Sequence, residues 1–359
     1  MSTTSPKTVL ALSNVRVFDG QKIQEPSTVI IDGELIGNPD AVPTETVDAH
    51  GSILLPGLID CHIHLTGPKD LSQMARYGVT TALDMATWPA DLLNSLRGRK
   101  GVTDIRGCGL AATAPGSAHS HIPTIPKEAL VSNTVEAETF VEKQVAEGAD
   151  YIKVVADIPG PSQECLNALV ESAHRRQRLV IAHAVTTMAT EMAQIAGADV
   201  ITHAPLNGIM NNEEVSQMLE EKRISVPTLT MMKGCAAKKP GAYKNAKDTV
   251  YALHRAGVPV LAGTDANMAP GVPFNVVHGI SLHEELELLV EAGLSTTEAL
   301  RAATHLPAEH FGLQDRGVIE PGRRADLILV KGNPVADIKA TRQIQRIWIA
   351  GQEFKPEIE

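Results

Sequence analysis

Histidine, lysine and aspartate residues stand at the ends of several apolar runs in this chain, where they could together hold metal ions. His62 and His64 end the first such run. They face the same side if the run is a β-strand, because alternate residues of a strand point the same way. Two imidazoles at this spacing can share a metal ion, although the pair alone also fits two structural polar side chains.

Further candidates stand at four later runs. Lys153 lies inside the apolar segment 151–156, where an ammonium group is costly to bury unless it is paired or reaches solvent from the strand end. His183 and His203 close two more runs, and Asp265 follows another. Each alone has a structural explanation. Four histidines, one lysine and one aspartate at five strand ends form a convergence that few structural explanations produce.

The apolar runs also predict the framework that positions these residues. Continuous apolar runs are typical of strands buried on both faces, and the amphipathic stretches between several of them, such as residues 135–147, predict helices. Eight strand–helix units in about 255 residues match a (β/α)8 TIM barrel, whose working end is the carboxyl edge of its strands. We therefore expect an α/β fold with this barrel over residues 56–312. The runs are 58–64, 79–85, 104–110, 151–156, 179–184, 199–203, 224–230 and 258–264.

The two chain ends show short strands instead. Asp32-Gly33 between apolar residues predicts a hairpin over residues 27–36, and the strand pattern returns after Gly312. We expect residues 1–55 and 313–359 to form one small β domain built from both termini.

Two motifs near the end of the barrel concern its helices. Ser295 followed by Glu298 three residues later is a capping box and predicts a helix start. His283-Glu284-Glu285 opens an amphipathic stretch, and we expect these three side chains on its solvated face.

The composition excludes several classes of protein. The 359 residues include 32 Lys+Arg and 42 Asp+Glu, a formal charge of -10, whereas nucleic acids and anionic membranes attract basic surfaces. No apolar run is long enough for a transmembrane helix, and residues 1–7 lack a signal-peptide pattern. The 4 cysteines show no CxxC spacing. We expect a cytoplasmic protein with a small-molecule substrate and no nucleic-acid or membrane partner.

Three segments resemble signatures of the amidohydrolase superfamily, and the likeness extends over almost the whole chain. Residues 54–64 are similar to its opening signature, and residues 263–265 and 322–327 are similar to its later landmarks. Within the superfamily the chain is most similar to the imidazolonepropionase- and prolidase-like branch. The family fold is a (β/α)8 barrel with a β-sandwich from the two termini. Relatives are often homo-oligomers, which we expect here too.

The resemblance implies a ligand set for two divalent metal ions. His62, His64 and Asp265 would hold the more buried ion, and His183 and His203 would hold the second. Imidazole and carboxylate ligands suit Zn2+, with manganese, cobalt and iron as alternatives.

The resemblance also implies the chemistry. Carbon dioxide would carboxylate Lys153, and the carbamate would bridge both ions. Water activated by both ions would attack a carbonyl carbon, and the second ion would stabilise the oxyanion. Asp265 would be catalytic, moving the proton from this water to the leaving group. His119 or His121, in the loop after the third strand, is similar to a histidine that contacts the substrate carbonyl in relatives, although both could be surface histidines.

The strand-end loops predict the character of the substrate. Most candidate pocket residues are apolar, and no arginine directly follows a barrel strand to hold a free carboxylate, as a dipeptidase usually requires. The branch often places a glycine pair after the carboxylated lysine, where residues 156–160 of this chain read Ala-Asp-Ile-Pro-Gly. The remaining predicted substrate-binding residues are Trp88, Leu206, Met231 and Asn267.

These features predict a binuclear metal-dependent hydrolase that cleaves a C–N bond other than a peptide bond. The bond would be an amide, cyclic or N-acylated, in a small neutral or apolar substrate. The alternatives are a lactonase or other ester hydrolase on the same site, a prolidase-like dipeptidase and a single-metal deaminase. A non-catalytic scaffold is disfavoured because all six ligands are present.

Overall fold

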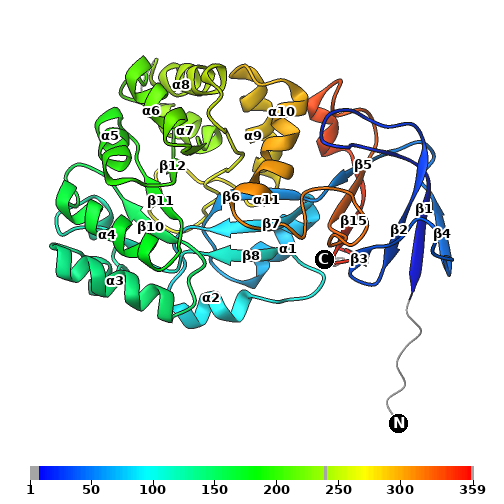
Figure 1. The fold of residues 1–359 in the computed structure, drawn as a ribbon, viewed down its shortest axis with the longest axis horizontal. Coiled ribbons are helices and arrows are strands. Elements are labelled where there is room, and N and C mark those ends of the chain that lie inside the picture. Colours follow the sequence, from blue (N-terminus) through cyan, green and yellow to red (C-terminus); the bar gives the residue numbers. More distant parts are fainter. Residues whose placement is uncertain (1–7, 238–240, 357–359) are drawn as a thin grey trace, which may run out of the picture.

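The computed structural model describes residues 8–237 and 241–356, and its parallel strands follow the predicted apolar runs (Figure 1). Residues 1–7, whose lack of a signal pattern supported the expected location, lie outside the described residues. One three-stranded sheet has the order β6-β7-β8, and a second sheet has the order β13-β12-β11-β10-β9. The strands are β6 (Leu58–Ile63), β7 (Val79–Asp84), β8 (Asp104–Gly107), β9 (Ala111–Ala112), β10 (Ile152–Val155), β11 (Val180–His183), β12 (Val200–Thr202) and β13 (Ile224–Val226).

All pairings within these two sheets are parallel, so the carboxyl ends of neighbouring strands lie at one edge. The predicted third run, residues 104–110, contains β8, which pairs with β7, while β9 begins directly after the run and pairs with β10. The first seven runs therefore contain strands as predicted. Most of their side chains are buried, which agrees with burial on both faces.

The eighth run, residues 258–264, differs from the prediction. It is not a regular strand, although single parallel bridges join Val260 to Ser225 of β13 and Ala266 to Ile63 of β6. One reason is that the backbone N–H of Thr264 donates to the Asp60 carboxylate at 3.0 Å instead of joining a ladder. The structure thus shows a TIM-barrel-type fold in which the described residues do not form one continuous barrel sheet.

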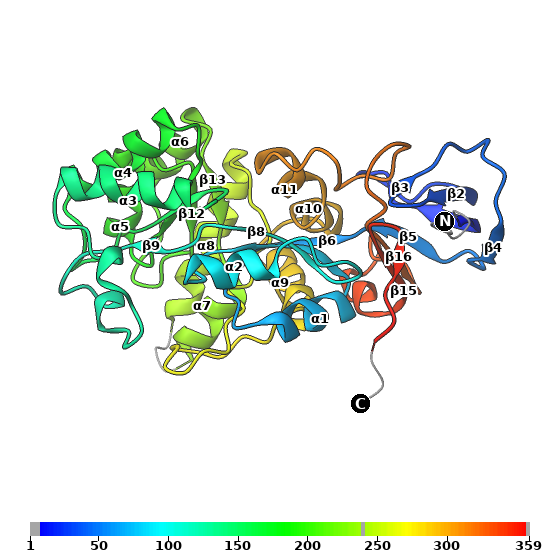
Figure 2. The ribbon, with the colours of Figure 1, turned by 90° about the horizontal axis from the view of Figure 1, so that it is seen from below.

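Helices follow most of these strands and surround the central strands (Figure 2). The capping box at Ser295 is confirmed, because its hydroxyl accepts from the Glu298 backbone N–H while the Glu298 carboxylate accepts from Ser295. The α-helices are α1 (Pro68–Arg76), α2 (Ala90–Leu96), α3 (Thr134–Ala146), α4 (Gln163–Arg175), α5 (Thr187–Ala196), α6 (Asn212–Glu220), α7 (Leu229–Ala236), α8 (Ala242–Ala256), α9 (Ile280–Glu291), α10 (Thr296–Ala302) and α11 (His305–His310).

The expectation for His283 and Glu285 is wrong, because both are buried in α9 and only Glu284 is partly exposed. Glu285 accepts hydrogen bonds from the backbone N–H groups of Leu229 and Thr230, at 2.9 and 2.7 Å, and from the Thr230 hydroxyl. These are the first residues of α7. A carboxylate from another helix therefore satisfies donors that every helix start leaves free.

Strands from both chain ends share one eight-stranded sheet at one end of the molecule (Figures 1 and 2). The predicted hairpin is present, with Gly33 in the left-handed region at φ 64. Leu12, Leu54 and Trp348 belong to a separate apolar cluster on this sheet. The strands are β1 (Val9–Val17), β2 (Ser27–Asp32), β3 (Leu35–Ile36), β4 (Glu45–Asp48), β5 (Ile53–Pro56), β14 (Leu327–Val330), β15 (Ile344–Ile349) and β16 (Gln352–Glu353).

This single sheet differs from the expected two-layer sandwich, and the domain boundaries at residues 55 and 313 stay a prediction.

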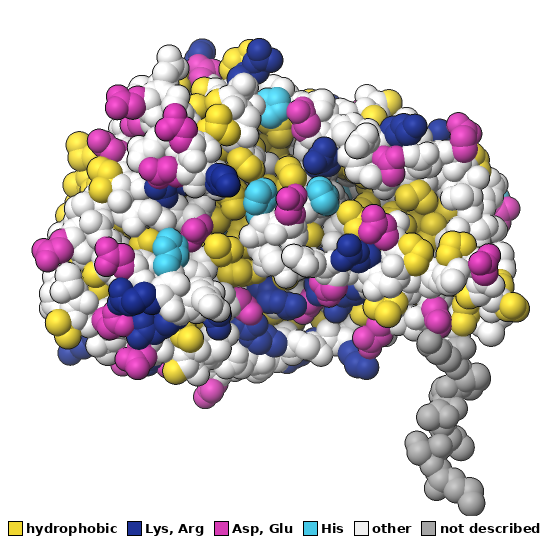
Figure 3. All heavy atoms as spheres, viewed as in Figure 1, with side chains coloured by type: hydrophobic (Ala, Val, Ile, Leu, Met, Phe, Trp, Pro, Cys, Tyr) yellow, Lys and Arg dark blue, Asp and Glu magenta, His cyan; other side chains and the backbone are white. Residues whose placement is uncertain are grey.

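Acidic and basic side chains are interspersed over the face in Figure 3 rather than gathered by sign. Among the described residues, no helix has both the length and the apolar character that a membrane span requires.

Candidate metal centre

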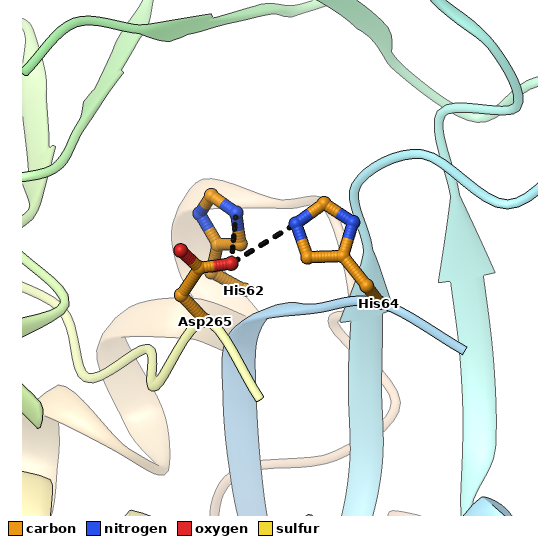
Figure 4. A group of neighbouring side chains, drawn as sticks. All are labelled: His62, His64 and Asp265. Atoms are coloured by element: carbon orange, nitrogen blue, oxygen red, sulfur yellow. Dashed lines mark ion pairs between the residues drawn. The ribbon is translucent and has the colours of Figure 1, made fainter. Parts of the chain in front are cut away.

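His62, His64 and Asp265 point toward one another at the carboxyl end of β6 (Figure 4). The Asp265 Oδ1 atom lies 3.4 Å from His62 Nε2 and 3.0 Å from His64 Nε2. His62 and Asp265 are buried and His64 is partly exposed. The predicted alternation of the two imidazoles and their meeting with Asp265 are therefore both present, and three ligand atoms converge on a volume that one ion could occupy.

Asp60 holds the two chain segments of this group together. Its carboxylate accepts hydrogen bonds from the backbone N–H groups of His62 and Thr264, at 3.2 and 3.0 Å, and from the Thr264 hydroxyl at 2.7 Å. Complete burial raises the pKa of Asp60 to about 7, although these hydrogen bonds oppose the shift. The sequence analysis gave Asp60 no role, and its place two residues before His62 in the same strand was the available signal.

His183 and His203 bring two further imidazoles to the same edge. Their ring centroids lie 4.3 Å apart, and those of His203 and His62 lie 5.0 Å apart. His203 Nδ1 is hydrogen-bonded to the Thr228 hydroxyl at 2.8 Å, whereas the buried Nε2 atom has no hydrogen-bond partner. Burial lowers the pKa of His203 well below its ordinary value, and the nearby His183 and Lys153 lower it further. The ring is therefore neutral, which is the form that binds metals.

Backbone conformation at these strand ends is unusual. His203, Thr228 and Asp265 have φ values of 74, 47 and 57, in the left-handed region that side chains other than glycine rarely adopt. Such conformations cost on the order of 1–3 kcal/mol each and cluster at functional sites, where surrounding contacts maintain them. The three turns aim side chains at the common edge.

Lys153 lies beneath these side chains in β10, paired in register with Ile181 of β11. It is 3% exposed, and its Nζ atom donates to the Thr202 hydroxyl at 3.1 Å. Burial lowers the pKa of Lys153 to about 8, although Cys108 and the carboxylates of Asp265 and Asp157 oppose the shift. A larger fraction of the amine is then neutral near pH 7, which is the form that carbon dioxide carboxylates.

Asp157 is a member of the site that the sequence analysis missed. It follows β10, and its Oδ2 atom lies 3.4 Å from both His119 Nδ1 and His183 Nε2. Burial alone would raise the pKa of Asp157, but the adjacent imidazoles of His119 and His183 hold it well below its ordinary value. Of the two loop histidines, the structure brings His119 to the centre, while His121 is exposed.

The other predicted substrate-binding residues occupy varied positions. Trp88 is partly buried and donates from Nε1 to the Thr124 carbonyl at 3.1 Å. Leu206 packs partly buried against the main apolar cluster, and Met231, 3% exposed, belongs to that cluster. Asn267 follows Asp265 by two residues and is partly exposed. The buried place of Met231 favours a packing role.

Five histidines form one continuous row. The successive ring centroids from His64 to His62, His203, His183 and His119 are 5.3, 5.0, 4.3 and 4.7 Å apart. A carboxylate stands at each end of this row, Asp265 beside the first two rings and Asp157 beside the last two. Imidazoles and carboxylates gathered at the carboxyl edge of parallel strands are the site type of a metal-dependent hydrolase with a TIM-barrel-type fold.

Comparison with known families identifies the group. The model of the Amidohydrolase family matches residues 53–354, which includes every predicted ligand. The chain therefore belongs to the Amidohydrolase family of metal-dependent hydrolases, and the resemblance inferred from residues 54–64, 263–265 and 322–327 is confirmed at this level.

Individual relatives match most of this chain. The ochratoxinase of Aspergillus niger is 27% identical over 419 residues, covering 94% of this chain and 84% of the relative. The adenine deaminase of Nitratidesulfovibrio vulgaris is 27% identical over 341 residues, covering 89% of this chain and 54% of the relative. A crystal structure of a Xaa-Pro dipeptidase with bound methionine superposes with a TM-score of 0.82 at 23% identity, covering 97% of this chain and 100% of that chain. The structural likeness concerns the fold.

Proposed function

We propose that this protein is a binuclear metal-dependent amidohydrolase that cleaves the C–N bond of an amide, cyclic or N-acylated, in a small neutral or apolar substrate. The observation that supports it most is the row of five histidine rings flanked by Asp265 and Asp157. One metal ion cannot contact the whole row, because ligand bonds of about 2.0–2.2 Å confine its ligands to a small volume. Two ions can.

His62, His64 and Asp265 would hold one ion, and His183 and His203 would hold the second. The unpartnered, buried Nε2 atom of His203 fits this assignment, because a buried ring nitrogen without a hydrogen-bond partner is otherwise costly. Lys153, as the carbamate, would bridge the two groups from below. When bound, two such ions acidify water and polarise a carbonyl group.

Asp265 is placed to move a proton in this reaction. Its Oδ1 atom lies beside His62 and His64, and its Oδ2 atom lies 3.9 Å from His203 Nδ1, so from its end of the row the carboxylate is close to both ligand groups. An amide nitrogen leaves poorly unless it is protonated. Asp265 would take the proton from the attacking water and deliver it to this nitrogen.

A substrate without a free carboxylate agrees with the charges around the site. The titratable groups beside the row include the carboxylates Asp265 and Asp157, the buried carboxyl groups of Asp60 and Asp84, and Lys153, which is an anion as the carbamate. A carboxylate of the substrate would face the two acidic side chains. A prolidase-like dipeptidase is the second candidate, because the fold superposes on a Xaa-Pro dipeptidase over 97% of the chain.

The proposal is tested with purified protein loaded with Zn2+ in bicarbonate buffer. N-acyl amides, cyclic amides, lactones and Xaa-Pro dipeptides of matched size are compared by kcat/KM. We expect neutral amides to exceed dipeptides at least 10-fold. Preferred lactones or preferred dipeptides would each replace the proposed substrate class, and no turnover of any of them would contradict it.

We further propose that the protein acts in the cytoplasm as a homo-oligomer.

A further inference from the structure

Asp157, His119 and His183 form a second ligand group that the predicted ligand set does not contain. The Asp157 Oδ2 atom lies 3.4 Å from each of two imidazole nitrogens, His119 Nδ1 and His183 Nε2. The three ligand atoms lie within 4.8 Å of one another, as do those of the first group, His62, His64 and Asp265. Each end of the histidine row thus has two imidazoles and one carboxylate.

These distances have the size expected between ligands of one ion. Two atoms that are each about 2.1 Å from an ion, at a tetrahedral angle, lie about 3.4 Å apart. The distances from Asp157 Oδ2 match this value on both sides, and so does the 3.4 Å distance from Asp265 to His62 Nε2 in the first group.

Two buried atoms of this group that lack a hydrogen-bond partner also support a shared ion. Asp157 Oδ1 and His119 Nδ1 are both buried and have no hydrogen-bond partner in the structure. A buried carboxylate oxygen without a donor is costly, and a cation beside it removes that cost. The side chain of Asp157 is 12% exposed and that of His119 is 29% exposed, so the group opens toward the site rather than into the core.

A positioning role is the simpler alternative, in which Asp157 only orients the two imidazoles by accepting their protons. The two roles exclude each other at His183 Nε2, because a nitrogen that donates a proton to Asp157 has no lone pair for a metal. If His183 holds the second ion, as proposed above, the 3.4 Å contact is a distance between two ligands.

We propose that Asp157 is a ligand of the second metal ion, together with His183, and that His119 completes this group. The inference rests on the proposed binuclear centre and extends its ligand set. A second carboxylate ligand favours harder divalent ions at this end of the row, since carboxylate oxygens suit Mn2+ better than imidazole does. We therefore expect the second site to accept Mn2+ as well as Zn2+.

The test is metal binding rather than activity. Metal-free protein is titrated calorimetrically with Zn2+ and with Mn2+, and the Co2+-loaded protein is examined by visible absorption. For Asp157→Asn, which is nearly isosteric, we expect one tight equivalent with unchanged affinity and a second weakened at least 10-fold, with an altered Co2+ spectrum. Asp91→Asn, in the first turn of α2, is the matched control and should bind as the wild type does.

Two other variants keep the test decisive. Asp157→Glu retains a carboxylate and should bind the second ion more tightly than Asp157→Asn, and His119→Ala should weaken the same ion. Two equivalents with wild-type affinities and an unchanged Co2+ spectrum in Asp157→Asn would overturn the inference and leave the binuclear hydrolase intact. Loss of the second ion together with no amide turnover by the wild type would instead support the ligand and contradict the proposed function.

Discussion

The Nδ1 atom of His203 is hydrogen-bonded to the hydroxyl of Thr228 at 2.8 Å, which leaves the buried Nε2 atom as the ring nitrogen without a hydrogen-bond partner. Partners of this kind set the orientation and basicity of metal-binding imidazoles. Both residues have left-handed backbone conformations at the ends of neighbouring strands, β12 and β13. The two turns and the hydrogen bond between them therefore act together on His203, one of the two imidazoles proposed to hold the second ion.

We expect Thr228→Val to lower the affinity for the second ion by about 10- to 100-fold, because the substitution removes the hydroxyl and keeps the side-chain shape. Calorimetric titration with Zn2+ measures this affinity. Thr228→Ser, which keeps the hydroxyl, is the matched control and should bind like the wild type. If Thr228→Val bound the second ion as tightly as the wild type does, the hydrogen bond would not position a ligand.

Glu285 predicts a pH dependence of stability. Burial raises the pKa of Glu285 to about 8 from its ordinary value of 4.5, although its hydrogen bonds to Leu229 and Thr230 oppose the shift. A raised pKa in the folded state contributes stability that is complete below the unfolded pKa and is lost as pH rises through the folded pKa. Because the carboxyl group titrates near 4.5 in the unfolded chain and near 8 in the folded one, the free energy of unfolding should fall progressively from about pH 4.5 to about pH 8 and level off above it, as measured by urea denaturation.

The variant Glu285→Gln isolates this contribution. It should flatten the pH dependence and cost about 1–3 kcal/mol, because the amide nitrogen faces the N–H donors at the start of α7. Glu284→Gln, at the adjacent, partly exposed position, should change neither property. A wild-type pH profile in Glu285→Gln would assign the dependence to another group.

The sequence predicted those parts of the site that periodic patterns determine. Apolar runs located the strands, and the alternation of His62 and His64 followed from strand geometry. Asp157 was missed because it lies in an irregular segment, where no period relates a residue to a direction. Glu285 was assigned to the solvated face because the sequence does not show that the start of α7 packs against α9. Such contacts depend on tertiary arrangement.

The eighth apolar run shows a similar limit. Hydrophobicity correctly predicted its burial, since Leu261 and Ala262 are 0% exposed. The carboxylate of Asp60 takes the Thr264 N–H from the strand ladder, and no local pattern reveals a side chain as a competitor for a backbone donor.

Asp265→Asn tests the proton transfer. The variant should remain folded, because an amide has nearly the same shape, and kcat for an amide substrate should fall by about 100- to 10,000-fold, the usual contribution of a general acid–base group. Steady-state kinetics and thermal denaturation measure the two properties. The metal content of the same samples separates a lost proton carrier from a lost ligand. Unchanged amide turnover would remove Asp265 from the proton transfer.

Lys153→Ala tests the bridge between the two groups of ligands. We expect it to lose the second ion and nearly all activity, because no other buried amine lies beside Asp265 and Asp157 among the described residues. Lys331→Ala, at an exposed position, is the control. Omission of bicarbonate during metal loading should lower activity of the wild type and leave Lys153→Ala unaffected. Two bound ions and full activity in Lys153→Ala would contradict the carbamate bridge.

The most direct test of the binuclear centre is the metal content of the wild-type protein, purified without chelator and measured by mass spectrometry as equivalents per chain. The row of histidines between two carboxylates predicts two equivalents of a divalent transition metal, restored by Zn2+ and bicarbonate after removal. One equivalent, unchanged after this treatment, would contradict the binuclear centre and favour single-metal chemistry such as deamination. No metal under any of these conditions would contradict metal-dependent hydrolysis altogether.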